Sequence, residues 1–210
     1  MKKIMFNDRY GLTKAVLDRK KTMTRRIIPI DLYNQTDWKA FSEGDYEAVV
    51  DGEGYYHDIR NCGKYHIGEE VAIAQPYKND DVLTYNAYNE DGTAREDGLQ
   101  RHKEMLDSKG YRNKMFVKAE YMPHRIRITG IKAERLQDIS DEDAMREGIR
   151  QSVVEYGDKK IVQWTYFGEK ITTWFDSPRE AFAALIDRIS GRGTWQRNPW
   201  VYAYTFELIK

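Results

Sequence analysis

The chain has 210 residues, 40% hydrophobic and 32% charged, and its 34 basic residues balance its 34 acidic ones. This composition is typical of one globular domain with a hydrophobic core, and no apolar run reaches the about 18–20 residues of a membrane-spanning helix. Nothing at the start resembles a secretory leader, and the single cysteine, Cys62, excludes an internal disulfide, so we expect a cytoplasmic protein.

The neutral total conceals a division of charge along the chain. Residues 1–30 hold nine Lys and Arg against two Asp, a balance of +7, whereas residues 31–60 hold eight Asp and Glu against two cations, a balance of −6. Overall neutrality disfavours a general nucleic-acid binder. The division fits either a basic site beside an acidic flap or two solvated surfaces of different charge.

Three helices are predicted from periodicity and capping residues. The first covers residues 10–20, where apolar side chains recur at i, i+3 and i+4. A short second helix begins after Ser140, a typical N-cap, and stops near Gly148. The third has Ser177 as its N-cap, followed by proline and a capping-box glutamate, and ends near residue 191.

Strands are predicted between and after these helices. Residues 71–74 are short and apolar, residues 125–131 alternate, and residues 200–208 are aromatic and β-branched on both faces. Three stretches are interpreted as insertions: about 31–66, 79–114 and 151–176, the last with a hairpin around 156–158. Short strands, few helices and long insertions predict a single α+β domain over 1–210, built on a small β-barrel.

A cluster of five cations with two threonines lies at the end of the first predicted helix and just after it. Residues 16–26 read V-L-D-R-K-K-T-M-T-R-R. In an extended chain, residues 22, 24 and 26 share one face and residues 21, 23 and 25 share the other. The twist at a helix-to-strand junction still allows Lys21 and Thr24 to come together. Taken alone, the charges favour a helix C-terminus whose cations compensate the helix dipole.

Ordered sequence blocks resemble the ASCH superfamily, especially its phage-encoded branch. Residues 21–26 (K-T-M-T-R-R), after an opening strand at 4–6, are similar to the signature G-x-K-T-x-T-R-R. Residues 122–129 resemble "M-P-R … R-I", residues 135–149 resemble "R-L-Q-D-I-S … D-A … E-G-I", and residues 195–207 resemble "W-x-x-N-P-W-V … F-E". The order of the blocks makes the resemblance far more specific than one K-T-x-T-R match.

This resemblance implies a PUA-like antiparallel β-barrel with flanking helices that binds RNA or a modified nucleoside. It also implies an alternative, an acetylcytidine-type amidohydrolase or a ribonuclease, whose catalytic set corresponds to Lys21, Thr24 and Glu147. In that set Thr24 is the nucleophile, and Lys21 is the base if burial and neighbouring cations lower its pKa. Glu147 orients the lysine or passes the proton to the leaving amine.

Five further residues in the matched blocks are predicted to contact the substrate: Arg26, Thr22, His124, Trp195 and Asn198. Arg26 suits a phosphate or a developing oxyanion. Trp195 suits stacking on a base, although core packing explains a tryptophan equally well. The histidines and the cysteine are scattered and no glycine-rich phosphate loop is present, so we predict no metal and no cofactor.

The chain departs from the ASCH pattern at three places. Arg19 stands where the pattern has glycine, Ala74 and Gln75 stand where it has Arg-Glu, and His124 replaces an arginine. A different substrate is one expected consequence. Three functional classes stay open: an RNA- or nucleoside-binding module, a metal-independent hydrolase, and a phage protein that acts on a host protein through its insertions.

Overall fold

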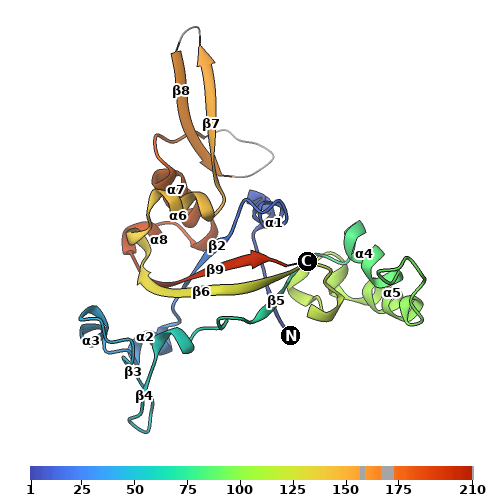
Figure 1. The fold of residues 1–210 in the computed structure, drawn as a ribbon, viewed down its shortest axis with the longest axis horizontal. Helices are drawn as coiled ribbons and strands as arrows, with labels where there is room; N and C mark the ends of the chain where they lie inside the picture. Colours follow the sequence, from blue (N-terminus) through green and yellow to red (C-terminus); the bar gives the residue numbers. More distant parts are fainter. Residues whose placement is uncertain (157–158, 167–172, 210) are drawn as a thin grey trace.

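The computed structural model describes residues 1–156, 159–166 and 173–209. They form an α+β fold around a mixed five-stranded sheet with strand order β1–β5–β6–β9–β2 (Figure 1). β1 pairs with β5 in parallel, and the other three pairings are antiparallel. The strands are β1 (Lys2–Ile4), β2 (Met23–Ile27), β5 (Glu70–Ile73), β6 (Arg125–Arg135) and β9 (Trp200–Leu208).

The sheet is open, so the predicted closed barrel is not found. β1 and β2 are the two edges of the strand order, and no ladder joins them among the described residues. β1 has only three residues, after which the chain turns into a 3₁₀ turn at Asp8–Tyr10. The Arg26 guanidinium crosses the opening instead, and its Nη2 donates to the Met5 carbonyl oxygen at 2.7 Å.

The three predicted helices are present, and the local chemistry of their first turns explains where two of them begin. α1 (Leu12–Leu17) is shorter than predicted because the 3₁₀ turn precedes it and a left-handed residue, Arg19, follows it. α6 (Asp141–Arg146) begins where the Ser140 hydroxyl accepts from the Asp143 amide. α7 (Pro178–Ser190) begins where the Ser177 hydroxyl accepts from the Glu180 amide. The short α8 (Thr194–Arg197) follows α7.

The main hydrophobic core lies between the sheet and helices α1 and α7. Period-two alternation sends Val71 and Ile73 of β5 into this core. The opposite face of β5 carries Ala72, which belongs to a second, smaller core. That core includes buried Tyr77, Val82 and Met105, so the segment predicted as a polar insertion at 79–114 contributes apolar packing of its own.

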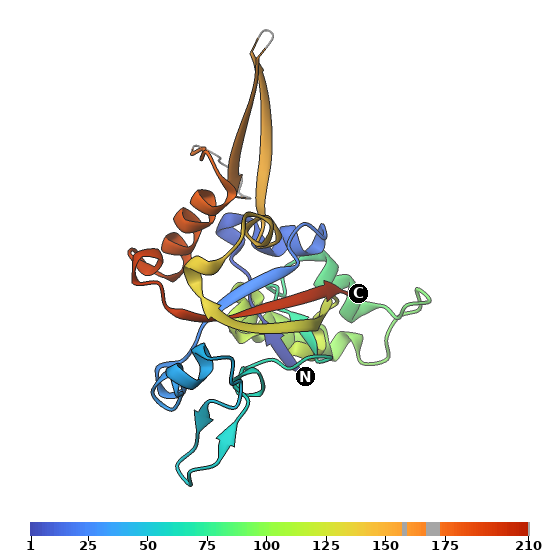
Figure 2. The same ribbon diagram turned by 60° about the vertical axis from the view of Figure 1, so that its left-hand side comes forward.

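The insertions form three attachments around the sheet (Figures 1 and 2). The first contains α2 (Ile30–Asn34), α3 (Trp38–Ser42), β3 (Val49–Val50) and β4 (Tyr56–His57), and the second contains α4 (Asp80–Ala87) and α5 (Gly98–Asp107). The third is a projecting ribbon of β7 (Ile149–Tyr156) and β8 (Lys159–Tyr166), while its predicted turn falls partly outside the described residues.

Further 3₁₀ turns occur at Ile59–Asn61, Lys109–Tyr111, Lys114–Phe116, Ala119–Tyr121 and Leu136–Asp138. In the described part of the chain, no helix has the length and apolarity needed to span a bilayer.

The turn after α1 requires a left-handed backbone at Arg19, whose φ is 57°. The turn closes where the Lys20 and Lys21 amides both donate to the Ala15 carbonyl oxygen, at 2.8 and 2.9 Å. Glycine adopts such a φ without steric cost, which gives a physical reason for the glycine of the ASCH pattern here. In this chain the Arg19 guanidinium donates to the Leu208 carbonyl oxygen at 2.8 Å, a contact that helps to hold the turn.

We expect the Arg19→Gly variant to be more stable than Arg19→Ala by about 1 kcal/mol. Both variants lack the guanidinium, so the comparison isolates the steric cost of a β-carbon in the left-handed region. Urea unfolding at neutral pH measures the difference. Equal stability of the two variants would show that this turn carries no backbone strain.

Candidate functional site

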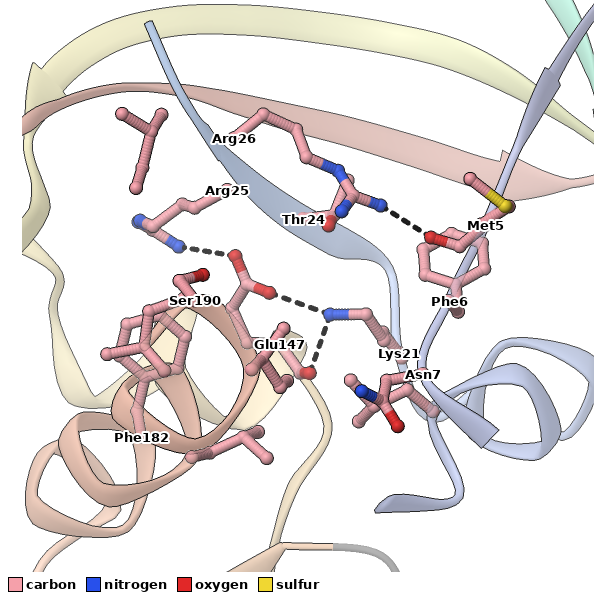
Figure 3. A pocket seen from close by; sticks show the side chains of 15 residues that line it. Met5, Phe6, Asn7, Lys21, Thr24, Arg25, Arg26, Glu147, Phe182 and Ser190 are labelled. Carbon is pink, nitrogen blue, oxygen red and sulfur yellow. Dashed lines mark hydrogen bonds and ion pairs between the residues drawn. The ribbon is translucent and has the colours of Figure 1, made fainter. Parts of the chain in front are cut away.

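A cavity of about 250 Å³ lies beside β2, between the residues that follow β1 and helix α7 (Figure 3). Its walls are largely apolar, and its charged groups come from β2, from Lys21 just before β2 and from Glu147 at the end of α6. The apolar lining includes Phe6, Leu12, Phe182, Leu185, Ile186 and Ile189; the charged and hydroxyl-bearing lining comprises Lys21, Thr24, Arg25, Arg26, Glu147 and Ser190.

Local structure places Lys21 against the end of α6. The Thr22 amide donates to the Arg146 carbonyl oxygen at 2.9 Å, which ties the start of β2 to the last turn of that helix. Glu147 caps α6 and is followed by Gly148, with φ 99°. A β-carbon on Gly148 would lie 3.6 Å from the Lys21 Cδ and closer still to Leu12, so glycine there leaves room for the lysine chain.

Lys21 and Glu147 form a buried ion pair, although about 125 residues separate them in the sequence. Lys21 Nζ donates to Glu147 Oε2 and to the Glu147 carbonyl oxygen, both at 2.7 Å. The two residues are 2% and 4% exposed. Burial lowers the pKa of Lys21, and the charge of Glu147 only partly offsets this effect.

Arg25 completes the charged cluster and was not among the predicted site residues. Its Nη1 lies 3.1 Å from the second Glu147 carboxylate oxygen, Oε1, so each oxygen of Glu147 has its own cation. Arg25 also bonds Glu134 through Nε at 3.0 Å and Nη2 at 2.6 Å, and Asp143 through Nη2 at 3.1 Å. Burial alone would raise the pKa of Glu147, but the charges and hydrogen bonds of Lys21 and Arg25 hold that pKa below its ordinary value.

Strict strand alternation predicted that Thr24 and Arg25 would point to opposite faces, yet both line the cavity. We attribute this to the position of β2 at the sheet edge, where a cavity can reach both sides of the strand. Thr24 is 4% exposed, and its hydroxyl makes no hydrogen bond within the described residues. Arg26 lies at the boundary of the cavity, tied to Met5 (Figure 3). The structure therefore brings Lys21, Thr24 and Glu147 together with Arg26 beside them, as the motifs predicted.

Two other predicted substrate-binding residues lie outside this cavity because they have structural partners elsewhere. The Thr22 hydroxyl accepts from Arg146 Nε at 3.3 Å, on the outer side of the turn. His124 Nε2 lies 3.1 Å from an Asp81 carboxylate oxygen, near α4. Neither side chain borders the space that Lys21 faces.

Trp195, in α8, and Asn198, in the turn before β9, also lie outside the cavity. The Trp195 ring packs edge-on against Phe182, with ring centroids 6.2 Å apart, so it supports the cavity wall from behind. Asn198 has a left-handed backbone with φ 45°, and its side-chain oxygen accepts from the Gln137 amide at 2.8 Å. Both residues therefore contact other parts of the fold and do not line the cavity.

Other features that the sequence suggested for the site also lie elsewhere. Ala74 packs in the second core, and Gln75 Nε2 donates to Asp81 at 2.9 Å, so neither residue of this departure from the ASCH pattern lines the cavity. No residue of the acidic stretch 31–60 lines the cavity, so the predicted acidic flap does not cover it directly. Among the described residues, no three His, Cys, Asp or Glu side chains are grouped in a way that could hold a metal ion.

The geometry thus defines a mostly apolar cavity with a buried Lys–Glu–Arg cluster on one wall and a threonine hydroxyl beside it. Comparisons of the chain with protein-family models, with curated proteins and with solved structures gave no match.

Proposed function

We propose that this chain binds a nucleoside or a short single-stranded RNA, with one base inside the cavity beside Lys21 and Thr24. The observation that carries the proposal is the combination of largely apolar walls with a few convergent polar groups, which is typical of sites for flat organic ligands. Phe6 and Phe182 offer ring surfaces to a heterocycle. We also propose that the open sheet is a variant of the PUA-like barrel, with the ligand at its opening.

The polar groups of the cavity suit the edge of a base. Lys21 has three ammonium protons, and two of them are donated to Glu147. The third has no acceptor within the described residues and is available for a carbonyl oxygen of the ligand. The Thr24 hydroxyl, which both donates and accepts, is available in the same way. The Lys21 ammonium, which donates, and the Thr24 hydroxyl, which donates and accepts, together match the edge of a nucleobase, where donors and acceptors lie side by side.

The charges favour a small ligand over a long duplex. Glu134, Asp143 and Glu147 surround Arg25 and Lys21, so this buried cluster has no excess of positive charge. Few phosphates can therefore be neutralised at one time, and binding to long duplexes should be weak. Single-stranded RNA, whose unstacked bases can enter a pocket, fits the geometry better.

One observation favours hydrolysis as a second candidate function: Thr24 shares the cavity with a lysine whose pKa is lowered by burial. In an amide substrate, Thr24 Oγ would form a bond to the acyl carbon while neutral Lys21 takes the hydroxyl proton. The carbon–nitrogen bond would then break as that proton passes to the leaving amine, and water would hydrolyse the acyl-threonine. No metal enters this scheme.

The Thr24→Val variant separates the two functions because valine keeps the shape of threonine without its hydroxyl. A binding module should lose at most about tenfold in affinity, the value of one neutral hydrogen bond. A threonine hydrolase should lose all turnover. The parent protein and the Thr24→Val variant are each incubated with acylated and other modified nucleosides and with short RNAs. Binding is measured by calorimetry, and products are detected by mass spectrometry.

The proposed function is contradicted if none of these ligands binds or reacts. It is equally contradicted by tight, salt-sensitive binding to random duplex DNA that survives the Lys21→Ala substitution, because such binding would not use the cavity.

A further inference from the structure

A second cavity of about 280 Å³ adjoins the first on the other side of Arg26. The two cavities share Met5, Arg26 and Ile27 in their linings. Each is slightly smaller than the about 300–1,000 Å³ typical of sites for small organic molecules. Each therefore suits a single ring system, and the adjoining pair suits a ligand with two rings.

Three tyrosines form a prearranged wall of the second cavity: Tyr65, Tyr202 and Tyr204. The Tyr204 ring centroid lies 5.7 Å from that of Tyr202 and 5.3 Å from that of Tyr65. The Tyr202 hydroxyl donates to the Ile59 carbonyl oxygen at 2.7 Å, and the Tyr65 hydroxyl donates to the Lys3 carbonyl oxygen at 3.1 Å. The wall therefore exists before any ligand binds and offers aromatic surface to one.

The charged side chains in the described lining of this cavity are all cationic. Lys3, Lys64 and Arg26 line it, and no carboxylate belongs to the described lining. Burial and the neighbouring charge of Lys64 lower the pKa of Lys3, and burial raises the pKa of Tyr65 to about 12. The tyrosine stays neutral at physiological pH, so it does not compensate the cations. An anionic ligand would relieve their mutual repulsion.

Arg26 is half-buried and lines both cavities. Its positive charge acts on Lys21 in the first cavity and on Tyr65 and Tyr204 in the second. One of its donors holds the Met5 carbonyl oxygen, and a guanidinium has further N–H groups in the same plane. That geometry suits a phosphate that links two ligand rings.

We propose that the second cavity is a subsite for the neighbouring nucleotide of a single-stranded RNA, with Arg26 on the phosphate between the two nucleotides. This inference rests on the proposed function, because it needs a base in the first cavity. The preferred ligand is then a dinucleotide step instead of a single nucleoside. The tyrosine wall contacts the second base, and the exposed Lys64 attracts the backbone. Lys3 adds positive charge nearby, while its Nζ donates to the Met115 and Val117 carbonyl oxygens at 2.7 and 2.6 Å.

The test compares RNA homodinucleotides that carry a second, terminal phosphate on the nucleotide in the second cavity with the matching nucleoside monophosphates by calorimetry. At least one dinucleotide should bind about tenfold tighter than its monophosphate, or about 1.4 kcal/mol. Lys64→Glu should abolish this gain and leave monophosphate affinity unchanged, because Lys64 is exposed and lines only the second cavity. Lys103→Glu is the matched control: it reverses the charge of an exposed lysine in α5, away from both cavities.

Cys62 provides an independent readout because it lines the second cavity and is the single cysteine of the chain. Burial, with a contribution from Asp58, raises the pKa of its thiol, so alkylation should be followed at mildly alkaline pH. Saturating dinucleotide should slow alkylation of Cys62, whereas saturating monophosphate should not. The mass of the intact protein reports the reaction.

The outcomes separate the two proposals. Equal affinity for dinucleotides and monophosphates, a gain that survives Lys64→Glu, or unchanged alkylation of Cys62 would overturn the subsite and leave the first cavity as the binding site. Absence of binding by either ligand class would overturn the proposed function, and the subsite with it.

Discussion

Replacing Arg25 by methionine is expected to lower the free energy of unfolding by about 3–5 kcal/mol, the cost of breaking a buried ion pair from one side. The Arg25 side chain is 1% exposed and contacts Glu134, Asp143 and Glu147. Methionine keeps much of the volume but removes the charge. Three carboxylates then remain close together with their main cation gone, and Glu147 and Glu134 are both buried.

Arg127→Met is the matched control for this prediction. Arg127 also contacts two carboxylates, those of Glu70 and Glu207, but its side chain is 45% exposed. Exposed ion pairs contribute only about 0–1 kcal/mol, so the free energy of unfolding of this variant should stay close to that of the parent protein. Urea unfolding of both variants gives the comparison. If Arg25→Met and Arg127→Met lowered the free energy of unfolding by similar amounts, the Arg25 cluster would stabilise the fold no more than a surface ion pair does.

The Lys21→Met variant is expected to separate function from stability. Ligand affinity should fall by about 10–100-fold, because a hydrogen bond from a charged group contributes about 1.5–3 kcal/mol. The free energy of unfolding should fall by less than in Arg25→Met. Glu147 still has Arg25 as a partner, and burying a lysine is itself unfavourable, as its lowered pKa indicates.

Lys14→Met controls for the loss of a lysine, since Lys14 is exposed on α1 and pairs with Asp18 at the surface. Calorimetry and urea unfolding should be applied to the same preparations. The prediction fails if Lys21→Met retains the parent's affinity. It also fails if this variant is destabilised as strongly as Arg25→Met, because Lys21 would then be a structural residue.

Features that depend on local chemistry were predictable from the sequence. Ser140 and Ser177 cap the helices that follow them, because a serine hydroxyl competes well for the first free amides. The strand at Trp200–Leu208 was predicted with its observed bounds, since a run of aromatic and β-branched residues favours a buried strand. The proximity of Lys21 and Glu147 followed from the ordered motif blocks.

Features that depend on packing between distant segments were not predictable in the same way. Arg25 looked like one of several cations in a basic run, and only the fold places three carboxylates around it. Trp195 and Asn198 lie in a matched block. In the fold, Trp195 packs behind the cavity wall against Phe182, and Asn198 accepts from the Gln137 amide in the turn before β9. The opening between β1 and β2 depends on where β1 stops, which no local pattern marked.

The first cavity is lined independently of the two longest attachments. Its described lining residues come from 5–27, from position 147 and from 182–190, so the long attachments at 31–66 and 79–114 contribute none. Loops and attachments of this kind tolerate changes of length and sequence far better than packed elements do. Changes of length or sequence in those attachments should therefore leave the lining around Lys21 in place.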